Sequence, residues 1–218
     1  MIKVYGTPVS NYSNMVTTTL LEKGIEFVEI TTMPNSDLLI GKSPMGKVPC
    51  VEINGHFLSE TATILDYIEK SYPNPPLYPA DAIAKAKVRE LARIIELYFE
   101  LVLRRLYPTV FFGAPRDDTI VSAVKPQIEK GILALNELAK FGPYLAGSEF
   151  GIADIYAYNS FGYGNKVTQS IYDLDLTAAI PGLSEAFAAI SARDSVKKVD
   201  SAQQQALAEL MAQRQEAG

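Results

Sequence analysis

The sequence is poor in the residues that most enzymes use for reactive chemistry. Its 218 residues include one cysteine, one histidine and no tryptophan. A zinc or iron site built from His and Cys ligands needs three or four of them, so we expect no metal site of that kind. A single cysteine cannot form a disulfide within the chain. If the protein is an enzyme, a ligand must therefore bring most of the reactive chemistry.

The chain also lacks a large excess of either sign of charge, and it lacks long apolar runs. The formal net charge is −5, with 20 basic and 25 acidic residues mixed along the chain, and no basic patch indicates a nucleic-acid partner. No run approaches the roughly 18 apolar residues of a membrane span, and the first residues lack the pattern of a signal peptide. We expect a cytoplasmic protein that binds neither nucleic acid nor a membrane.

A proline-rich stretch divides the chain into two parts of different character. Four of the 13 prolines fall within Tyr72–Pro79, where they prevent a helix from continuing. We predict a first domain over residues 1–76, a linker over 77–83 and a second domain over 84–218.

The first part alternates short strands with helices in the order βαβ–ββα. Asn54-Gly55 between two short apolar runs is typical of a tight hairpin. His56 follows this turn and is expected to be exposed, whereas Cys50 is expected to be buried. The predicted strands cover Ile2–Tyr5, Phe27–Thr31, Val51–Ile53 and His56–Leu58, and the predicted helices cover Asn14–Lys23 and Thr61–Ser71.

The second part reads as helix almost throughout, so the fold class is α/β followed by all-α. Apolar residues recur at spacings of three and four. The segment Ile152–Tyr163 is apolar on nearly all sides, which indicates a helix at the centre of the domain. The predicted helices cover residues 84–112, 119–139, 152–163, 183–193 and 196–213.

Three motifs fall at defined places in this order of elements. Ser43–Cys50 (SPMGKVPC) precedes the hairpin, Leu58–Leu65 (LSETATIL) opens a helix, and Leu145–Ile155 (LAGSEFGIADI) opens the central helix. Together they resemble the cytosolic glutathione S-transferase superfamily over nearly the whole chain, in its serine-type (theta-, zeta- and nu-like) classes. The resemblance implies a thioredoxin-like domain that binds glutathione, a helical bundle that binds a small hydrophobic electrophile, and a homodimer.

The first and second of these motifs also assign the glutathione contacts. The resemblance implies a cis peptide bond at Val48-Pro49 and a main-chain hydrogen bond from Val48 to the cysteinyl part of glutathione. A helix N-terminus favours a carboxylate, so Thr61 and the helix that it opens suit the γ-glutamyl carboxylate, while Glu60 suits the neighbouring ammonium. The plainer alternative is that this segment only caps the helix.

Two lysines lie in the loop before the proline. Lys47, and less strongly Lys42, is expected to neutralise the glycyl carboxylate of the tripeptide.

The catalytic position lies between the first strand and the first helix. Ser10 stands where the serine-type classes carry their serine, and a hydroxyl that donates a hydrogen bond to sulfur favours the reactive thiolate. Asn11 offers an amide for the same purpose, and Tyr12 is a rival. Ser10 as a simple N-cap is the structural alternative. Because none of the three is cysteine, the loop argues against the omega- and beta-type members, and it also departs from the zeta-type isomerases.

The remaining candidates lie in the second part. Tyr107 and Phe111 are assigned to the second-substrate pocket, within an aromatic set that also includes Tyr98, Phe99 and Phe112, although such residues also suit a core. The pair Arg104-Arg105 could face an anionic second substrate or solvent. Asp154 is expected to cap the central helix, although Gly151 replaces the usual Ser or Thr of that capping box.

The interpretation that follows is a glutathione transferase that uses glutathione as co-substrate and no metal. It would activate the thiol for attack on a hydrophobic electrophile, a peroxide or a disulfide. Two alternatives stay open: a non-enzymatic adaptor that resembles stringent starvation protein A, and a glutathione-dependent disulfide reductase.

Overall fold

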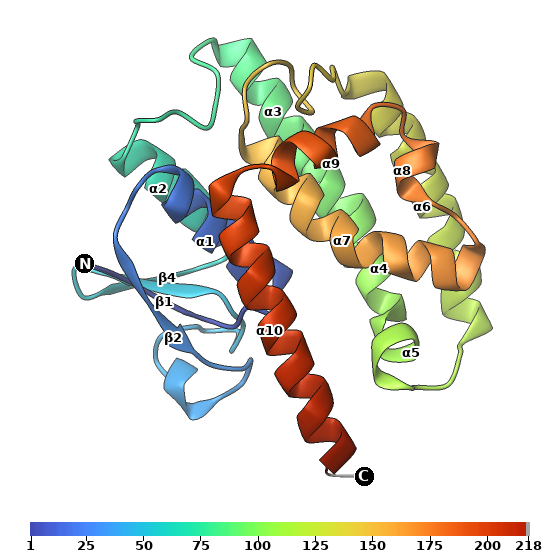
Figure 1. The fold of residues 1–218 in the computed structure, drawn as a ribbon, viewed down its shortest axis with the longest axis horizontal. Helices are drawn as coiled ribbons and strands as arrows, with labels where there is room; N and C mark the ends of the chain where they lie inside the picture. Colours follow the sequence, from blue (N-terminus) through green and yellow to red (C-terminus); the bar gives the residue numbers. More distant parts are fainter. Residues whose placement is uncertain (217–218) are drawn as a thin grey trace. The chain divides into compact units, whose positions relative to one another are not determined.

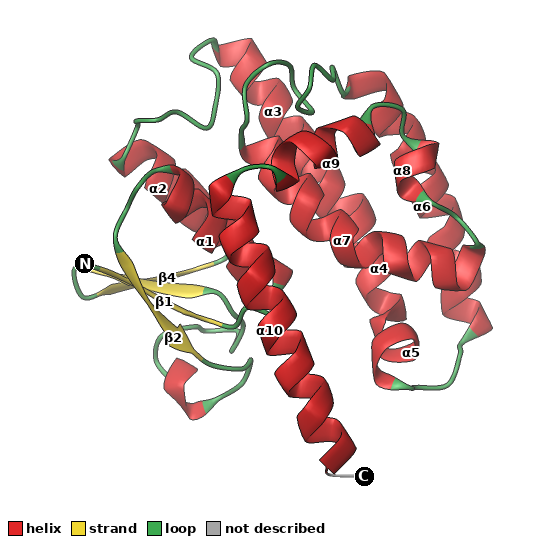
Figure 2. Ribbon diagram, in the orientation of Figure 1, coloured by secondary structure: helices red, strands yellow, loops and turns green. Residues whose placement is uncertain are grey.

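A four-stranded mixed sheet forms the centre of the first of two units in the computed structural model, which describes residues 1–216 (Figures 1 and 2). The strand order is β2-β1-β3-β4. β1 (Ile2–Gly6) runs parallel to β2 (Phe27–Thr31) and antiparallel to β3 (Cys50–Ile53). β4 (His56–Ser59) completes the predicted hairpin.

The hairpin turn has the predicted chemistry. Asn54 and Gly55 both have positive φ, at 51° and 80°, as a two-residue turn between right-twisted strands requires. His56 is exposed and Cys50 is fully buried, as expected.

Helices α1 (Asn11–Glu22) and α2 (Thr61–Ser71) pack against one another and contribute the buried apolar side chains of this unit. α1 begins three residues before the predicted start, because Ser10 caps it there. The opposite face of the sheet carries Tyr5 and Cys50 beneath Leu39 of the short helix η1 (Asp37–Leu39), which the sequence pattern did not predict. The core between sheet and helices includes Ile2, Val4, Val51, Ile53, Met15, Val16, Leu20, Ile64, Leu65 and Ile68.

The last helix, α10 (Asp194–Glu216), belongs to this first unit. It packs on α1 and buries Val196 and Val199. The first unit therefore joins Met1–Pro76 with the segment from Ser191 onward, and the second unit is Leu77–Ile190. This division differs from the expected second domain over 84–218, since the contacts of α10 lie with a helix far away in the sequence.

The second unit is helical. The predicted helix over 84–112 is instead a series: α3 (Ala82–Ile95), a π-helical turn η2 (Glu96–Glu100), α4 (Leu101–Leu103), a 3₁₀ turn η3 (Arg104–Leu106) and α5 (Tyr107–Phe112). The apolar stripe runs through these changes of geometry, so the pattern does not reveal them. The others are α6 (Asp118–Leu138), α7 (Ile152–Tyr172), α8 (Leu176–Ala179) and α9 (Leu183–Ser191).

α7 is the central helix of this unit, as predicted. Six consecutive residues at its start, Ile152–Ala157, are buried, and it packs against α3. It continues nine residues beyond the predicted end because Val167 and Thr168 bury a further turn that reads as polar in the sequence. Among residues 1–216, no helix has the length and apolar character that crossing a bilayer requires.

Candidate functional site

Three loops meet at one end of the sheet. The strand register pairs Tyr5 with Cys50, and Cys50 with Ser59, so the end of β1, the start of β3 and the end of β4 are neighbours at about 4.8 Å per strand. The loop to α1 leaves β1 here, Pro49 directly precedes β3, and Glu60 directly follows β4. The register thus brings together three segments that the sequence separates by up to 50 residues.

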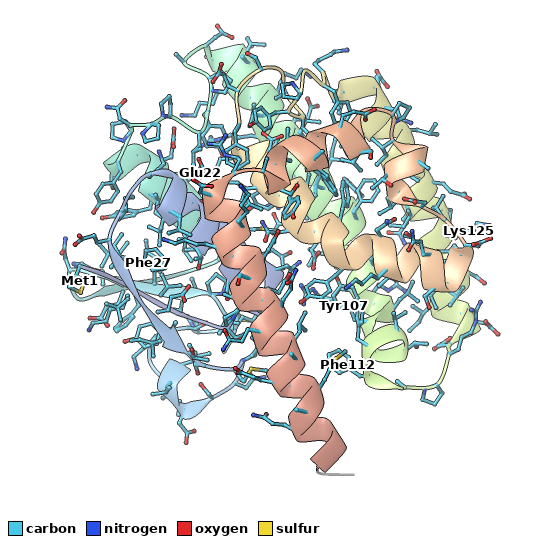
Figure 3. The ribbon with its side chains drawn as sticks, in the orientation of Figure 1. Met1, Glu22, Phe27, Tyr107, Phe112 and Lys125 are labelled. Atoms are coloured by element: carbon cyan, nitrogen blue, oxygen red, sulfur yellow. The ribbon has the colours of Figure 1, made fainter. Side chains whose placement is uncertain are left out.

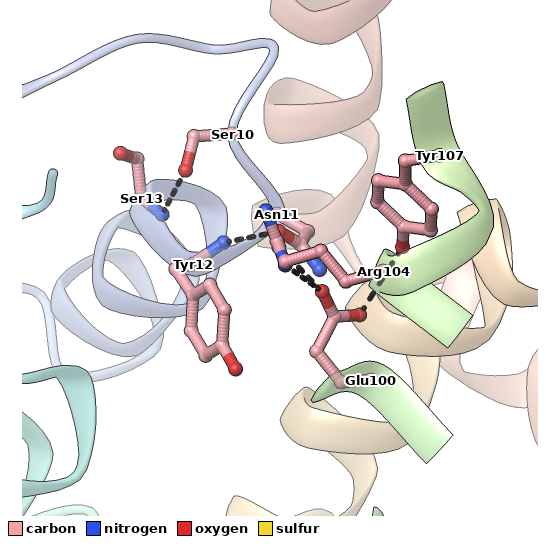
Figure 4. A network of polar contacts seen from close by, with 7 residues as sticks. All are labelled: Ser10, Asn11, Tyr12, Ser13, Glu100, Arg104 and Tyr107. Atoms are coloured by element: carbon pink, nitrogen blue, oxygen red, sulfur yellow. Dashed lines mark hydrogen bonds and ion pairs between the residues drawn. The ribbon is translucent and has the colours of Figure 1, made fainter. Parts of the chain in front are cut away.

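Ser10 is the N-cap of α1. Its Oγ accepts a hydrogen bond from the N–H of Ser13 at 3.3 Å (Figure 4), and its side chain is half-buried. The hydroxyl accepts in this bond, so its own hydrogen is not used in it. The capping alternative is therefore correct as geometry, and it leaves Ser10 able to donate.

Asn11 opens the helix beside it. Its side chain is buried, and its Oδ1 accepts a hydrogen bond from the N–H of Tyr12 at 3.0 Å (Figure 4). The first turn, residues 11–14, contains no ionisable side chain apart from the phenol of Tyr12, so the positive end of the helix dipole is not neutralised from within the turn.

The peptide bond Val48-Pro49 is cis, as the resemblance implied. Within residues 1–216, no hydrogen bond joins the main chain of Val48 to the rest of the protein. The loop before it is braced by Ser43, whose Oγ donates to the carbonyl of Lys47 at 2.8 Å and accepts from its N–H at 3.1 Å. The side chain of Lys47 is left exposed.

Glu60 is the N-cap residue of α2 and has φ 69° and ψ 111°. A non-glycine residue with positive φ outside the left-handed helical region is strained, and such strain concentrates at binding sites. The Glu60 side chain is exposed and, within the described chain, caps no N–H of the helix. Thr61 behind it is 6% exposed.

Lys42 is engaged elsewhere. Its Nζ donates to the carbonyl of Leu38 at 2.8 Å and lies 5.5 Å from the ring centre of Tyr5. The hydroxyl of Tyr5 donates to Glu52 at 2.9 Å, and burial, followed by that carboxylate, raises the pKa of Tyr5. Burial likewise raises the pKa of the Cys50 thiol, so neither Tyr5 nor Cys50 suits the role of an activated nucleophile.

Sequence comparison identifies the family. Residues 4–76 match the profile described as "Glutathione S-transferase, N-terminal domain", and residues 79–194 match "Glutathione S-transferase, C-terminal domain". The chain belongs to the glutathione S-transferase family.

Individual relatives agree with this assignment. A glutathione S-transferase of Pseudomonas putida is 40% identical over 182 residues, which cover 83% of each chain. A stringent starvation protein A homologue of Pasteurella multocida is 26% identical and covers 66% of each chain. Among solved structures, maleyl pyruvate isomerase, a bacterial zeta-class glutathione S-transferase, superposes with a TM-score of 0.74 at 25% identity, over 90% of this chain and 95% of that one.

The helical unit of this glutathione S-transferase contains an aromatic cluster. Tyr107 and Phe111 lie edge to face with ring centres 5.1 Å apart, and Tyr163 of α7 lies 6.2 Å and 5.7 Å from them. The sequence pattern missed Tyr163, because it lies on a different helix at the end of an apolar run. Of the other predicted aromatic residues, Phe99 is fully buried core, whereas Phe112 is exposed (Figure 3).

A buried carboxylate adjoins this cluster. Glu100 has a fully buried side chain and pairs with Arg104, whose Nε lies 3.1 Å from Oε1 (Figure 4). The Tyr107 hydroxyl lies 3.5 Å from Oε2. Nothing in the residue pattern distinguishes Glu100 from the exposed glutamate Glu90 of the same helical stretch.

Asp154 has the structural role that the sequence predicted. Its two carboxylate oxygens accept the N–H groups of Leu145 and Gly151, each at 2.8 Å. Gly151 is explained by Leu77: a Cβ at residue 151 would lie 2.6 Å from the Leu77 carbonyl, which accepts the N–H of Ile152 at 3.1 Å. A neighbouring carbonyl thus serves the helix end in place of the missing Ser or Thr.

A separate groove of about 750 Å³ lies between α6 and the end of α7. Its lining includes Arg116, Lys125 and Tyr172, but none of the residues predicted for the site. Its two cations pair with the nearby carboxylates of Asp118 and Glu129. In residues 1–216, no group of three or more His, Cys, Asp or Glu side chains could hold a metal ion.

Proposed function

We propose that this protein is a glutathione transferase, which binds glutathione at the end of the sheet and activates its thiol for attack on a hydrophobic electrophile, a peroxide or a disulfide. The observation that carries the proposal is the register through Tyr5, Cys50 and Ser59. It joins the N-terminus of α1, the cis bond before Pro49 and the strained Glu60 at one end of a domain of the glutathione S-transferase family.

The tripeptide would bind along this end from α2 toward the Lys47 loop. The N-terminus of α2 and Thr61 suit the γ-glutamyl carboxylate, and the exposed Glu60 suits the ammonium beside it. The main chain of Val48 suits the cysteinyl amide groups. Lys47 is exposed and suits the glycyl carboxylate.

Ser10 acts on the sulfur. Its Oγ already accepts the N–H of Ser13, so its own hydrogen can donate to the thiolate at the positive end of α1. Both features favour the anion and lower the pKa of the bound thiol. The thiol proton leaves to solvent, and the sulfur lone pair forms the new bond to the electrophile while the bond to the leaving group, or the π bond in an addition, breaks. The electron pair of the broken bond stays on the leaving group or on the adduct, which takes up a proton from water. Asn11 is a second candidate donor through its amide.

The test combines calorimetric titration with glutathione and a pH titration of the bound thiolate by ultraviolet absorbance. Ser10→Ala should bind glutathione about as well as wild type, with the thiol pKa raised by about 1–2 units because one hydrogen bond to a charged group is lost. Ser10→Asp keeps an oxygen that can cap the helix but places a negative charge beside the sulfur, so it should raise the pKa further without loss of thermal stability.

The outcomes separate the alternatives. If the wild type does not bind glutathione, the transferase proposal fails and the adaptor alternative gains support. If the wild type binds but Ser10→Ala leaves the thiol pKa unchanged, Ser10 is only a helix cap.

Three further features are proposed from the family. The second substrate is a small hydrophobic electrophile that contacts Tyr107 and Phe111. The protein is cytoplasmic, and it forms a homodimer, for which sedimentation equilibrium should give twice the chain mass of 23.9 kDa.

A further inference from the structure

The ion pair between Glu100 and Arg104 is built differently from the surface pairs of the helical unit. The Glu100 side chain is completely buried, whereas that of Arg104 is 43% exposed. In the ion pair between Lys87 and Glu90, by contrast, both side chains are at least 44% exposed. Burying a carboxylate costs several kcal/mol unless a well-placed cation compensates it. The buried member is therefore the costly one, and its partner is the member that reaches the surface.

This arrangement fixes the position of Arg104. Its Nε donates to Glu100 Oε1 at 3.1 Å, and Nη2 donates to the same oxygen (Figure 4). Its guanidinium carbon lies 5.2 Å from the ring centre of Tyr107, within the range of a cation–π contact. A flexible side chain is thus held from two sides, and less conformational entropy remains to be lost when a ligand binds it.

The backbone at this point is also irregular. Glu100 ends the π-helical turn η2, and Arg104 opens the 3₁₀ turn η3. π-helical turns are rare and occur frequently at functional sites.

An apolar wall adjoins the guanidinium. The ring of Tyr107 packs edge to face against Phe111 and in a tilted arrangement against Tyr163. Burial raises the pKa of Tyr163; the charge of Glu100 raises it further, and the charge of Arg104 lowers it. A fixed, planar cation beside Tyr107, whose ring packs against two further rings, matches a ligand with an aromatic or unsaturated body and a carboxylate at one end.

We propose that Arg104 is a specificity-determining residue that selects electrophiles carrying a carboxylate, and that Glu100 holds Arg104 in position for this role. This inference rests on the proposed glutathione transferase activity. In the reaction with an aryl vinyl ketone, the glutathione thiolate forms a C–S bond to the terminal alkene carbon. The electron pair of the C=C bond moves into the carbonyl as an enolate, which then takes a proton from water on the adjacent carbon.

The experiment uses ethacrynic acid and its methyl ester, which share one reactive enone and differ in charge far from it. We measure kcat/KM for each with saturating glutathione and divide it by the uncatalysed rate. The ratio of acid to ester is the readout. Wild type should prefer the acid, and Arg104→Gln should lower the ratio by about tenfold or more, since a charge-assisted hydrogen bond is lost.

The controls separate this role from general charge and from folding. Arg105→Gln removes the same charge from the neighbouring exposed side chain and should change the ratio less than about twofold. Arg104→Gln leaves Glu100 buried without its cation and can destabilise the fold. The double variant Glu100→Gln/Arg104→Gln avoids that cost and should lose the preference to the same extent.

The outcomes are distinct. If the double variant and Arg104→Gln turn over both compounds with the wild-type ratio, Arg104 does not select the anion. If Arg105→Gln lowers the ratio as much as Arg104→Gln, the effect is a general surface field and the inference is wrong. If the wild type binds glutathione but turns over neither compound, this substrate class is wrong while glutathione binding stands. If it does not bind glutathione at all, the proposed function itself fails.

Discussion

Glu60 combines an exposed carboxylate with a backbone conformation that residues other than glycine avoid. Its φ is 69°, and three other non-glycine residues in the described chain share a positive φ: Asn35, Asn54 and Asp173. Asn and Asp tolerate this region because their short side chains bond locally, whereas glutamate does not. Local side-chain bonding therefore does not explain the positive φ at residue 60, and we propose that binding by its carboxylate does.

Replacing Glu60 separates strain from binding. Glu60→Gly should relieve the positive φ and raise the free energy of unfolding by roughly 1 kcal/mol, while the affinity for glutathione falls because the ammonium loses its partner. Glu60→Gln keeps the strain and loses the charge, so it should lower the affinity with unchanged stability. Thermal unfolding and calorimetric titration measure the two effects. A glycine variant with wild-type glutathione affinity would contradict the assignment of Glu60.

At the scale of elements, the start of α7 shows how a contact between segments replaces a local motif. The capping box keeps its Asp154 half, and in place of an N-cap side chain the Leu77 carbonyl accepts a different N–H, that of Ile152, while it approaches too closely for a Cβ at position 151. The residue that is best at an N-cap by local preference is therefore not the best at this N-cap.

Two glycine substitutions in α7 should have opposite signs. Gly151→Ser restores the usual capping residue, yet its Cβ would meet the Leu77 carbonyl at 2.6 Å, so we expect a loss of about 1–3 kcal/mol, as for other overpacked positions. Gly162→Ala is the matched control. Apart from the neighbouring backbone of its own helix, no heavy atom of residues 1–216 lies within 4 Å of its added Cβ, and alanine should stabilise the helix by about 0.5–1 kcal/mol. Chemical denaturation measures both, and a stabilised Gly151→Ser would show that the local preference dominates.

At the scale of the whole chain, its two ends are joined in one unit. Glu22 at the end of α1 accepts hydrogen bonds from Arg193 Nε at 2.7 Å and Nη2 at 2.6 Å, and another from Ser195 at the start of α10. Burial alone would raise the pKa of Glu22, but the hydrogen bonds from Arg193 and Ser195 and the charge of Arg193 lower it overall. The contact spans 171 residues of sequence.

This contact predicts a pH dependence. The pKa of the Glu22 carboxyl lies below its ordinary value of 4.5 in the folded protein. Its contribution to stability is therefore present above pH 4.5 and is lost as the pH falls through the pKa of the folded state. Glu22→Gln should therefore melt below wild type near neutral pH, and the difference should shrink in acid. Glu26→Gln, at an exposed position, is the control and should track wild type throughout. A difference that persists unchanged in acid would contradict the role of the Glu22 charge.

Elements whose signals are local could be predicted from the residue pattern alone. The strand Phe27–Thr31 and the helix Thr61–Ser71 lie where the pattern predicted them, because alternation, helical spacing and turn residues act over a few positions. The Asn54-Gly55 hairpin follows for the same reason. The three motifs around Pro49, Glu60 and Asp154 were sufficient to predict the family, and that resemblance in turn implied the cis bond before Pro49. The helix start at Thr61 and the cap by Asp154 follow from local signals.

Features that depend on residues far apart in the chain became visible only in the folded protein. The sequence does not show that α10 packs on α1, that Glu100 is buried, or that Tyr163 joins Tyr107 and Phe111. An apolar stripe says that a helix has a buried face but not which helix covers it. A charged residue on such a stripe reads as exposed until its neighbours are known, which is why the pairing of Glu100 with Arg104 became visible only once the helices were packed.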